Sequence, residues 1–315
     1  MHWKLKAAIQ NLIAMLPNEL SYSVYYQFQR HFGGLKRVNP SKRLSAGVAT
    51  WKKILEHGQS AIGKVFFEVG TGRVPIVPLS YWLMGADKVV TIDLNPYLKD
   101  ELVQESLKWI SDNEEGVRNL FGSLLHVERF GGLLNWYRGG NFNVAEFLNL
   151  CQIQYIAPGD ASKTGLSSKS IDFHTSYTVL EHIPEQILIE ILQEGNRLVK
   201  NNGLFVHRID YSDHFSHSDK NISAINFLSF NDKNWKKLAG NRYMYMNRLR
   251  HDDFIKIFEQ VNHNIIKAET NIDSRIKDIL LTKSIRIDEK FNDKSNEILA
   301  TTGSWMVTRP GHQSI

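Results

Sequence analysis

The chain has 315 residues, which at roughly 150 residues per domain corresponds to one enlarged domain or about two ordinary ones. Hydrophobic residues make up 42% and charged residues 23%, which excludes a wholly disordered or fibrous protein, and no apolar run approaches the ~18 residues that span a bilayer. The 38 Lys and Arg residues outnumber the 33 Asp and Glu residues by five, an excess too small to indicate a nucleic-acid-binding tail.

Residues 1–60 are predicted to form a helical extension. Apolar residues at helical spacing over 1–16 indicate an amphipathic helix that packs on the rest of the protein, with an interfacial membrane helix as the less favoured alternative. An aromatic run predicts a second helix over 21–32, and the basic stretch 36–43 is expected to be a solvated connector. Gln10 interrupts any secretory signal, and the single cysteine, Cys151, favours a reducing compartment, so we expect a cytoplasmic protein.

Residues 61–315 are predicted to form an α/β domain, because short β-rich runs alternate with longer helical ones. The predicted architecture is a Rossmann-like, doubly wound, seven-stranded sheet with its ligand site beyond the carboxyl ends of the strands. An irregular, partly helical insertion is expected over 111–150, and an irregular segment over 211–250. Helices are expected over 78–85, 98–110, 184–199 and 251–261, and strands over 64–69, 88–93, 153–158, 171–176, 203–210, 264–270 and 304–309.

A glycine-containing turn follows the first predicted strand. Glu68 ends that strand, and Gly70 and Gly72 permit positive φ and a close approach of the backbone to a ligand. A dinucleotide fingerprint, GxGxxG, would place a third glycine three residues after Gly72, where this chain has Pro75. The turn therefore predicts a ligand site but argues against NAD or FAD.

Two further acids follow the next two strands. Asp93, after the second strand, is placed to accept hydrogen bonds from both hydroxyls of an adenosine ribose. Asp160, after the third strand, is placed to accept one from an adenine amino group. The alternative interpretation is structural: Asp93 caps a helix or starts a turn, and Asp160 lies in an exposed loop.

Five segments resemble, in order and spacing, the motifs of class I S-adenosylmethionine-dependent methyltransferases. They are EVGTGR, TIDLNP, APGDAS, IDFHTSYTVLEHIP and VKNNGLFVHRID, and the resemblance covers residues 65–210. It implies a seven-stranded sheet with a reversed terminal hairpin and S-adenosyl-L-methionine as the cofactor. The third glycine of the family's ExGxGxG motif falls at Val74, which departs from the pattern.

The resemblance also implies a role for each matching residue. The turn after the first strand would hold the methionine portion, the acid after the second strand the ribose, the loop after the third strand the adenine, and the end of the fourth strand would flank the methyl group. In that order, the implied cofactor-binding residues are Glu68, Gly70, Thr71 and Gly72; Asp93 and Leu94; Asp160 and Ala161; and Ser176 and Tyr177.

The segment after the fifth strand, HRIDYSDHFSHSDK, is dense in polar groups and is the predicted acceptor pocket. A histidine or aspartate there is the usual candidate to remove a proton from a hydroxyl or amine acceptor. The candidate catalytic residues are His207, Asp210, His214 and His182. An ordinary polar loop is the alternative, and His182 is equally a structural helix-start residue.

Metal binding is a further alternative for this segment. Its three histidines, His207, His214 and His217, with Asp210 and Asp213 exceed the minimum for a zinc or divalent-ion site. No HExxH spacing is present, however, and no metal is expected.

Aromatic and basic residues alternate over 241–250, NRYMYMNRLR. Arg242 and Tyr243 are predicted to bind substrate as part of a lid, with Arg248 and Arg250 also available to an anion. The same pattern suits single-stranded RNA, and a packed helix with snorkelling arginines is at least as plausible.

These observations predict a soluble S-adenosylmethionine-dependent methyltransferase that methylates an oxygen or nitrogen of a small molecule, such as a specialised metabolite, sugar or lipid-like compound. One alternative is an RNA methyltransferase, although no separate RNA-binding module is visible and a nucleic-acid partner is not favoured. The other is a methyltransferase-like binding protein without turnover. The sequence carries no signal for an oligomeric state.

Overall fold

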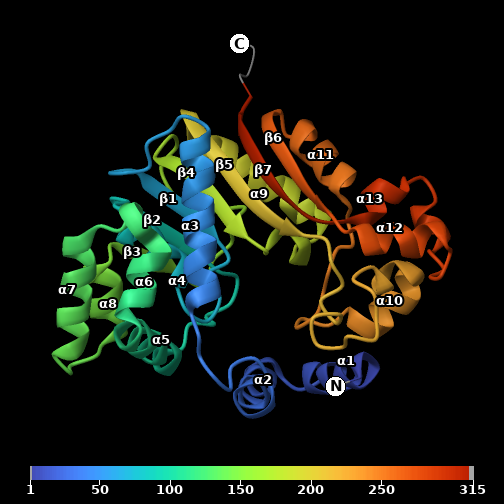
Figure 1. Cartoon of the computed structure of the whole chain (residues 1–315), viewed down its shortest axis with the longest axis horizontal. Helices are drawn as coiled ribbons and strands as arrows, with labels where there is room; N and C mark the ends of the chain where they lie inside the picture. Colours follow the sequence, from blue (N-terminus) through green and yellow to red (C-terminus); the bar gives the residue numbers. More distant parts are fainter. Residues whose placement is uncertain (1, 312–315) are drawn as a thin grey trace.

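The computed structural model describes residues 2–311, and a single seven-stranded sheet forms its centre (Figure 1). The strand order is β3-β2-β1-β4-β5-β7-β6, with β7 antiparallel to both of its neighbours and the other pairings parallel. All seven predicted strands and the doubly wound α/β fold are confirmed. The strands are β1 (Val65–Val69), β2 (Lys88–Ile92), β3 (Ile153–Ile156), β4 (Ile171–Tyr177), β5 (Val199–Asp210), β6 (His263–Ile272) and β7 (Thr301–Pro310).

The central strands are apolar on both faces because helices cover both sides of the sheet. In β1, four of the five residues, from Phe66 to Val69, are buried, as expected for a parallel strand between two helical layers. One core lies between the sheet and α3 (Ser41–Glu56), α4 (Ile76–Leu83) and α5 (Asp100–Asp112). The core on the other face includes residues of α9 (Glu185–Leu198) and α11 (His251–Gln260). This sandwich fixes the strand ends that carry the candidate site.

The insertion over 111–150 is more regular than predicted. It forms α6 (Glu114–Phe121), a short 3-10 helix (Gly122–Leu124), α7 (Val127–Arg138) and α8 (Val144–Leu150). Gly131 and Gly132 lie inside α7 with no atoms near their absent side chains, while Leu133 and Leu134 on the same helix are buried. Burial of this apolar face outweighs the low helix propensity of glycine.

The basic stretch 36–43 is only partly a connector, because α3, a helix that was not predicted, begins at Ser41. Leu44, Val48, Trp51 and Ile54 lie at helical spacing and are buried. The apolar face of α3 therefore belongs to the main core.

The amino-terminal helices α1 (Trp3–Ala14) and α2 (Asn18–Phe32) lie below the sheet in Figure 1, with α1 beside α10 (Asp232–Ala239). Trp3 and Ala7 pack in a third core with Phe215 and Trp235, and the Trp3 backbone N–H donates to Asp219 at 2.9 Å. The predicted packing of this helix on the protein is confirmed. Within residues 2–311, none of the helices combines the length and the apolar character that crossing a membrane requires.

The remaining elements follow β4 or lie in the connections between β5, β6 and β7. A 3-10 helix (Leu180–His182) follows β4, and another (Asn226–Ser229) precedes α10. Between β6 and β7 the chain forms α12 (Ser274–Leu281), a 3-10 helix (Glu289–Phe291) and α13 (Asn296–Ala300). The segment 211–250 is largely irregular, as predicted, apart from the 3-10 turn and α10.

Candidate functional site

The turn after β1 lies against the segment after β4. Gly70 has a φ of +90°, and a Cβ atom placed on it would lie 2.6 Å from a methyl carbon of Val179. Gly72 has a φ of +68°, and a Cβ there would lie 3.6 Å from an Arg43 guanidinium nitrogen. Both glycines therefore have the positive φ that the sequence predicted, and Gly70 also has no room for a side chain.

Asp93 joins this turn to the end of β2. Its Oδ2 accepts a hydrogen bond from the Gly72 backbone N–H at 2.8 Å, and its Oδ1 accepts one from the Asn95 N–H at 3.2 Å. Burial raises the pKa of this half-buried carboxyl group, whereas the two backbone donors lower it. A carboxylate offers about four acceptor positions, so Asp93 keeps capacity for further donors.

The loop after β3 is tied to the same place. The Gly159 N–H donates to the Asp93 carbonyl at 2.9 Å, and a Cβ on Gly159 would collide with Ile92 and Ile156. Asp160 itself is exposed, and its Oδ1 accepts from the Ser162 N–H and hydroxyl at 2.8 and 2.7 Å. Ala161 is buried, whereas Leu94 is 72% exposed, so an apolar surface lies open beside Asp93.

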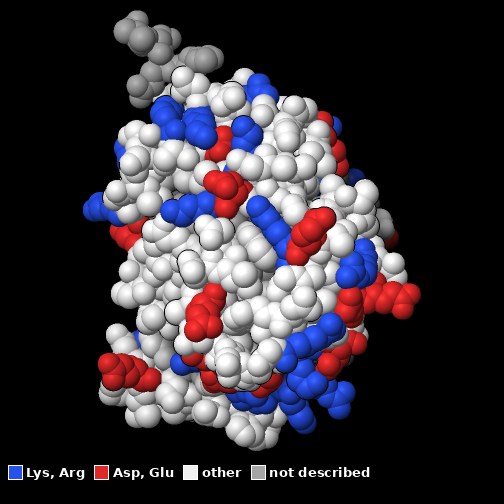
Figure 2. Space-filling view, turned by 90° about the vertical axis from the view of Figure 1, so that its left-hand side faces the viewer, with Lys and Arg blue, Asp and Glu red and all other residues white. Residues whose placement is uncertain are grey.

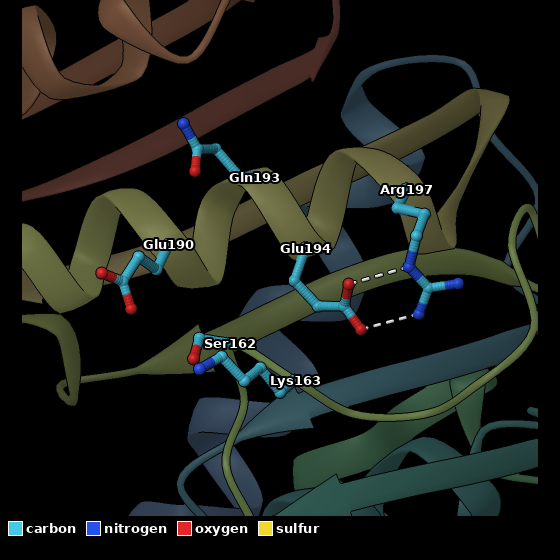
Figure 3. A pocket seen from close by; sticks show the side chains of 6 residues that line it. All are labelled: Ser162, Lys163, Glu190, Gln193, Glu194 and Arg197. Atoms are coloured by element: carbon cyan, nitrogen blue, oxygen red, sulfur yellow. Dashed lines mark hydrogen bonds and ion pairs between the residues drawn. The ribbon is translucent and has the colours of Figure 1, made fainter.

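A cavity of about 460 Å³ lies between this loop and α9 (Figure 3). Its lining is mostly charged, and the Glu194 and Arg197 side chains that point toward one another form an ion pair at 2.7 Å. None of the predicted site residues lines it. The lining residues are Ser162, Lys163, Glu190, Gln193, Glu194 and Arg197.

A smaller cavity of about 160 Å³ lies beside the glycine turn and contains three arginines, Arg37, Arg43 and Arg73. Arg43 comes from the start of α3 and lies 3.4 Å from the Val74 carbonyl. Sequence reasoning missed this residue, because the basic stretch was predicted to be a solvated connector. One indirect signal for a basic cavity here was present in the sequence. Another of its arginines, Arg73, comes directly after the second glycine of the turn.

Glu68 does not face this space. Its side chain is 2% exposed and accepts hydrogen bonds from the Thr175 hydroxyl and, at 3.1 Å, from Tyr81. Burial raises its pKa to about 7, against the lowering effect of the two donors. The predicted contact of Glu68 with a methionine portion is therefore corrected: its carboxyl group ties β1 to β4 and α4 inside the core. Thr71 is likewise turned inward, with its hydroxyl 2.6 Å from that of Thr91.

His207 and Ser176 are partners inside the protein. The Ser176 hydroxyl lies 2.8 Å from Nδ1 of His207, and both side chains are buried, with His207 wholly unexposed. Burial, with His174 nearby, lowers the pKa of His207 well below its usual value. The prediction that His207 lines an acceptor pocket is wrong for this structure, because its ring touches no open surface. The Ser176 hydroxyl is buried with His207 and is not free to flank a methyl group. Tyr177 is half-buried, with its ring against Trp305.

The other predicted catalytic residues do come together, at the adjacent ends of β4 and β5. Asp210 Oδ2 lies 3.4 Å from His214 Nε2 and 3.9 Å from His217 Nε2. The His182 ring lies across the His214 ring with centroids 4.8 Å apart. Glu181, beside His182, is 2% exposed, and burial raises its pKa well above the usual value. We call Glu181, His182, Asp210, His214 and His217 the histidine cluster.

Asp213 is a structural residue. It is fully buried, its Oδ1 accepts from the Phe215 N–H at 2.8 Å, and its Oδ2 accepts from the Asn226 side chain at 2.9 Å. These bonds shape the loop after β5. They remove Asp213 from the set of groups available to a ligand.

The segment 241–250 divides into two parts. Arg248 and Arg250 are 4% and 0% exposed. Their guanidinium groups donate to backbone carbonyls, such as that of Phe227 at 2.9 Å for Arg248 and that of Tyr211 at 2.7 Å for Arg250. The expectation that these two arginines are available to an anion is therefore corrected, since they hold the loops together.

The other part, around Tyr243, contacts α2 over the carboxyl edge of the sheet. The Tyr243 ring stacks on Tyr25 at 3.9 Å, and its hydroxyl lies 2.5 Å from that of Ser21. Arg242 is exposed and donates to Asn18 at 2.5 Å. Because α2 also reaches the loop after β2, through a 3.1 Å hydrogen bond from Tyr22 to Asn95, it bridges the Asp93 side and the 241–247 segment.

Comparison with known proteins finds no matching family model and no matching curated protein. Solved structures of similar fold include a SAM-dependent methyltransferase from Methanosarcina mazei, with 11% identity, a TM-score of 0.47, and coverage of 82% of this chain and 98% of that one. Another is geranyl diphosphate C-methyltransferase from Streptomyces coelicolor A3(2), with 8% identity, a TM-score of 0.47, and coverage of 83% and 78%. These likenesses concern the fold alone. The strand order and the antiparallel β7 of this chain are those of the class I methyltransferase fold that its sequence motifs imply.

Proposed function

We propose that this chain is an S-adenosylmethionine-dependent methyltransferase that acts on a small-molecule acceptor. The observation that carries the proposal is the hydrogen bond from the Gly72 N–H to Asp93, which joins the glycine turn after β1 to the acid after β2. Ligands of open α/β sheets bind at this carboxyl edge. On this proposal, residues 61–315 form the catalytic domain together with α3, which packs in its core, and the rest of residues 1–60 forms its extension.

The residues at this edge fit the cofactor. Asp93 has acceptor positions for ribose hydroxyls, and the exposed Leu94 offers an apolar surface to a base. The Asp160 carboxylate is exposed beside them. Gly70 and Gly72 expose backbone at the turn, and Arg43 lies beside Gly72 with a charge that complements an amino-acid carboxylate. When bound, the cofactor supplies an electrophilic methyl group.

The acceptor side is assigned to the carboxyl edge of the sheet, where the histidine cluster and α2 lie. Asp210, His214 and His182 stay the candidate catalytic groups, Arg242 and Tyr243 the candidate substrate contacts, and Tyr177 a candidate cofactor contact. Alignment of acceptor and methyl donor, together with exclusion of water under α2, would supply most of the rate of such a transfer.

An RNA substrate has less support. The segment 241–250 and the small net positive charge suggested it, but two of the three arginines of that segment, Arg248 and Arg250, bind backbone carbonyls inside the protein. On the face drawn in Figure 2, basic and acidic side chains are interspersed, with Lys and Arg gathered mainly at the lower edge. RNA binding requires an extended positively charged surface, and the described residues on this face do not form one.

Incubation with fractionated cell extract and methyl-labelled S-adenosylmethionine tests the proposal. We expect label in a small molecule with the wild-type protein and not with Asp93→Ala. Label in RNA would favour the RNA alternative. Cofactor binding without transfer to any fraction would favour a binding protein without turnover.

A further inference from the structure

The histidine cluster gathers more potential metal ligands than an acceptor pocket needs. It forms where the 3-10 helix after β4 meets the segment after β5, two strands that are neighbours in the sheet. Two groups of three ligand atoms share His214: one with Glu181 and His182, the other with Asp210 and His217. Within each group the atoms all lie within 4.8 Å of one another.

These spacings are close to those around a bound ion. Ligands at ~2.1 Å from a metal in tetrahedral arrangement lie about 3.4 Å apart. His214 Nε2 and Asp210 Oδ2 are already 3.4 Å apart, and His217 Nε2 is 3.9 Å from the same oxygen. Small side-chain rotations would therefore bring these atoms to ligand distances.

Several polar atoms of the cluster are buried without a partner. Within residues 2–311, both carboxylate oxygens of Glu181 lack a hydrogen-bond partner, and the Nε2 atom of His214 has only the long 3.4 Å contact with Asp210 Oδ2. Glu181 is 2% exposed, and one of its oxygens belongs to the group of three with His182 and His214. Buried polar groups almost always have partners, so two carboxylate oxygens left without any indicate a missing ligand.

Other contacts orient the ligand atoms. The Nδ1 atom of His182 lies 2.7 Å from the Tyr245 carbonyl, which makes Nδ1 the donor and leaves the lone pair on Nε2. Metal-binding histidines are typically held in this way through the nitrogen that does not bind the ion. Asp210 Oδ1 accepts from the Ser212 N–H and hydroxyl, at 2.8 and 2.6 Å, which leaves Oδ2 toward the histidines.

We propose that the histidine cluster binds one divalent transition-metal ion, with His214 as the ligand common to both groups. Imidazole nitrogens with carboxylate oxygens suit zinc, iron, cobalt or nickel better than magnesium or calcium, which prefer all-oxygen sites. The Ser212 hydroxyl, 3.0 Å from His217 Nε2, is the partner that His217 exchanges for the ion. A nitrogen that binds the ion no longer has the lone pair that a base needs, so on this proposal His182 and His214 act as metal ligands, and the base role given to them above no longer applies.

The test uses untagged full-length protein freed of metal by chelation. Zn²⁺ is titrated by calorimetry, and Co²⁺ by the visible absorption that reports its ligands. We expect one ion per chain, with affinity reduced ~10–100-fold or more in His214→Ala and in Asp210→Asn. His214→Gln, which keeps a polar side chain of similar reach, provides a second variant in case alanine unfolds the loop, and thermal unfolding checks each protein.

His126→Ala is the matched control, because His126 and Glu128 form an exposed pair, at 3.1 Å, at the start of α7, which lies beside the β3 edge of the sheet (Figure 1), whereas the cluster follows β4 and β5. It should bind Zn²⁺ as the wild type does. Wild-type binding no tighter than that of folded His214→Gln, or an equal loss in His126→Ala, would overturn the proposal. The titration needs no cofactor, so its outcome is independent of whether the protein transfers methyl groups.

Discussion

Gly70 and Val179 meet at the point where the turn after β1 passes the segment after β4. A Cβ atom on Gly70 would lie 2.6 Å from one Val179 methyl carbon and 2.9 Å from the other, and the φ of +90° is one that L-residues rarely adopt. This contact fixes the turn after β1 against the segment that runs from β4 to the histidine cluster. The same turn carries Gly72, whose N–H donates to Asp93.

Replacing Gly70 by alanine should therefore have two costs, backbone strain and a collision with Val179. Gly58 provides the matched control, because it has a φ of +72° and nothing within 4 Å of the point where a Cβ atom would lie. We expect Gly58→Ala to lower the free energy of unfolding by about 1 kcal/mol and Gly70→Ala by roughly 2–4 kcal/mol, measured by urea unfolding. Equal losses of stability for the two substitutions would show that Val179 leaves room for a side chain at position 70.

Glu68 should make stability depend on pH. A free glutamate titrates near 4.5, whereas burial raises the pKa of Glu68 to about 7 in the folded protein. The folded state thus holds the proton more tightly, so this contribution to stability is full below pH 4.5 and is lost as the pH rises from there through 7. The slope reaches at most about 1.4 kcal/mol per pH unit.

Glu68→Gln removes this titration. The free energy of unfolding of the wild type, relative to that of the variant, should fall as the pH rises from about 5 to about 8. The exposed Glu115 provides a control, and Glu115→Gln should follow the wild-type pH profile. Parallel profiles for wild type and Glu68→Gln would contradict the assignment.

His207 should act on stability and not directly on the chemistry. It is wholly buried, and its loss leaves a cavity and an unpartnered Ser176 hydroxyl. We expect His207→Ala to lower the free energy of unfolding by roughly 2–4 kcal/mol, measured by urea unfolding. If the folded variant instead keeps full stability and loses turnover, a catalytic role for His207 returns.

Arg43 provides a test of which part of the cofactor lies at the turn. If it binds the amino-acid carboxylate, Arg43→Ala should weaken S-adenosylhomocysteine binding about tenfold through loss of a charge-assisted hydrogen bond. Adenosine has no carboxylate, so its affinity should not change. The exposed neighbour Lys42 serves as the control. Equal losses for both ligands would mean that Arg43 acts through the fold of the turn.

The strands and the carboxyl edge were predictable because their signals are local. The apolar run of β1, the glycines after it, and Asp93 at the end of β2 follow directly from residue order, and the structure joins Asp93 to Gly72. The helical insertion was less predictable, since Gly131 and Gly132 lower helix propensity locally and only the burial of Leu133 and Leu134 reveals α7.

The roles of the histidines required the three-dimensional packing. His207 and Asp210 lie three residues apart on one strand, yet the ring of His207 packs inside against α11 through Phe258, and Asp210 reaches the edge. Strand alternation places the two side chains on opposite faces, but the sequence does not show which face is closed by α11 and which end is open. The pairing of His182 with His214, 32 positions later, likewise depends on β4 and β5 being neighbours.

The most direct test of a cofactor site at the carboxyl edge is calorimetric titration of the protein with S-adenosylhomocysteine. The wild type should bind, and Asp93→Ala should bind ~10–100-fold more weakly, or by about 1.5–3 kcal/mol, through loss of hydrogen bonds to the ribose. Asp87→Ala, an exposed aspartate before the amino end of the same strand, should bind as the wild type does. No binding by the wild type, or equal affinity in folded Asp93→Ala, would contradict a cofactor site at this edge of the sheet.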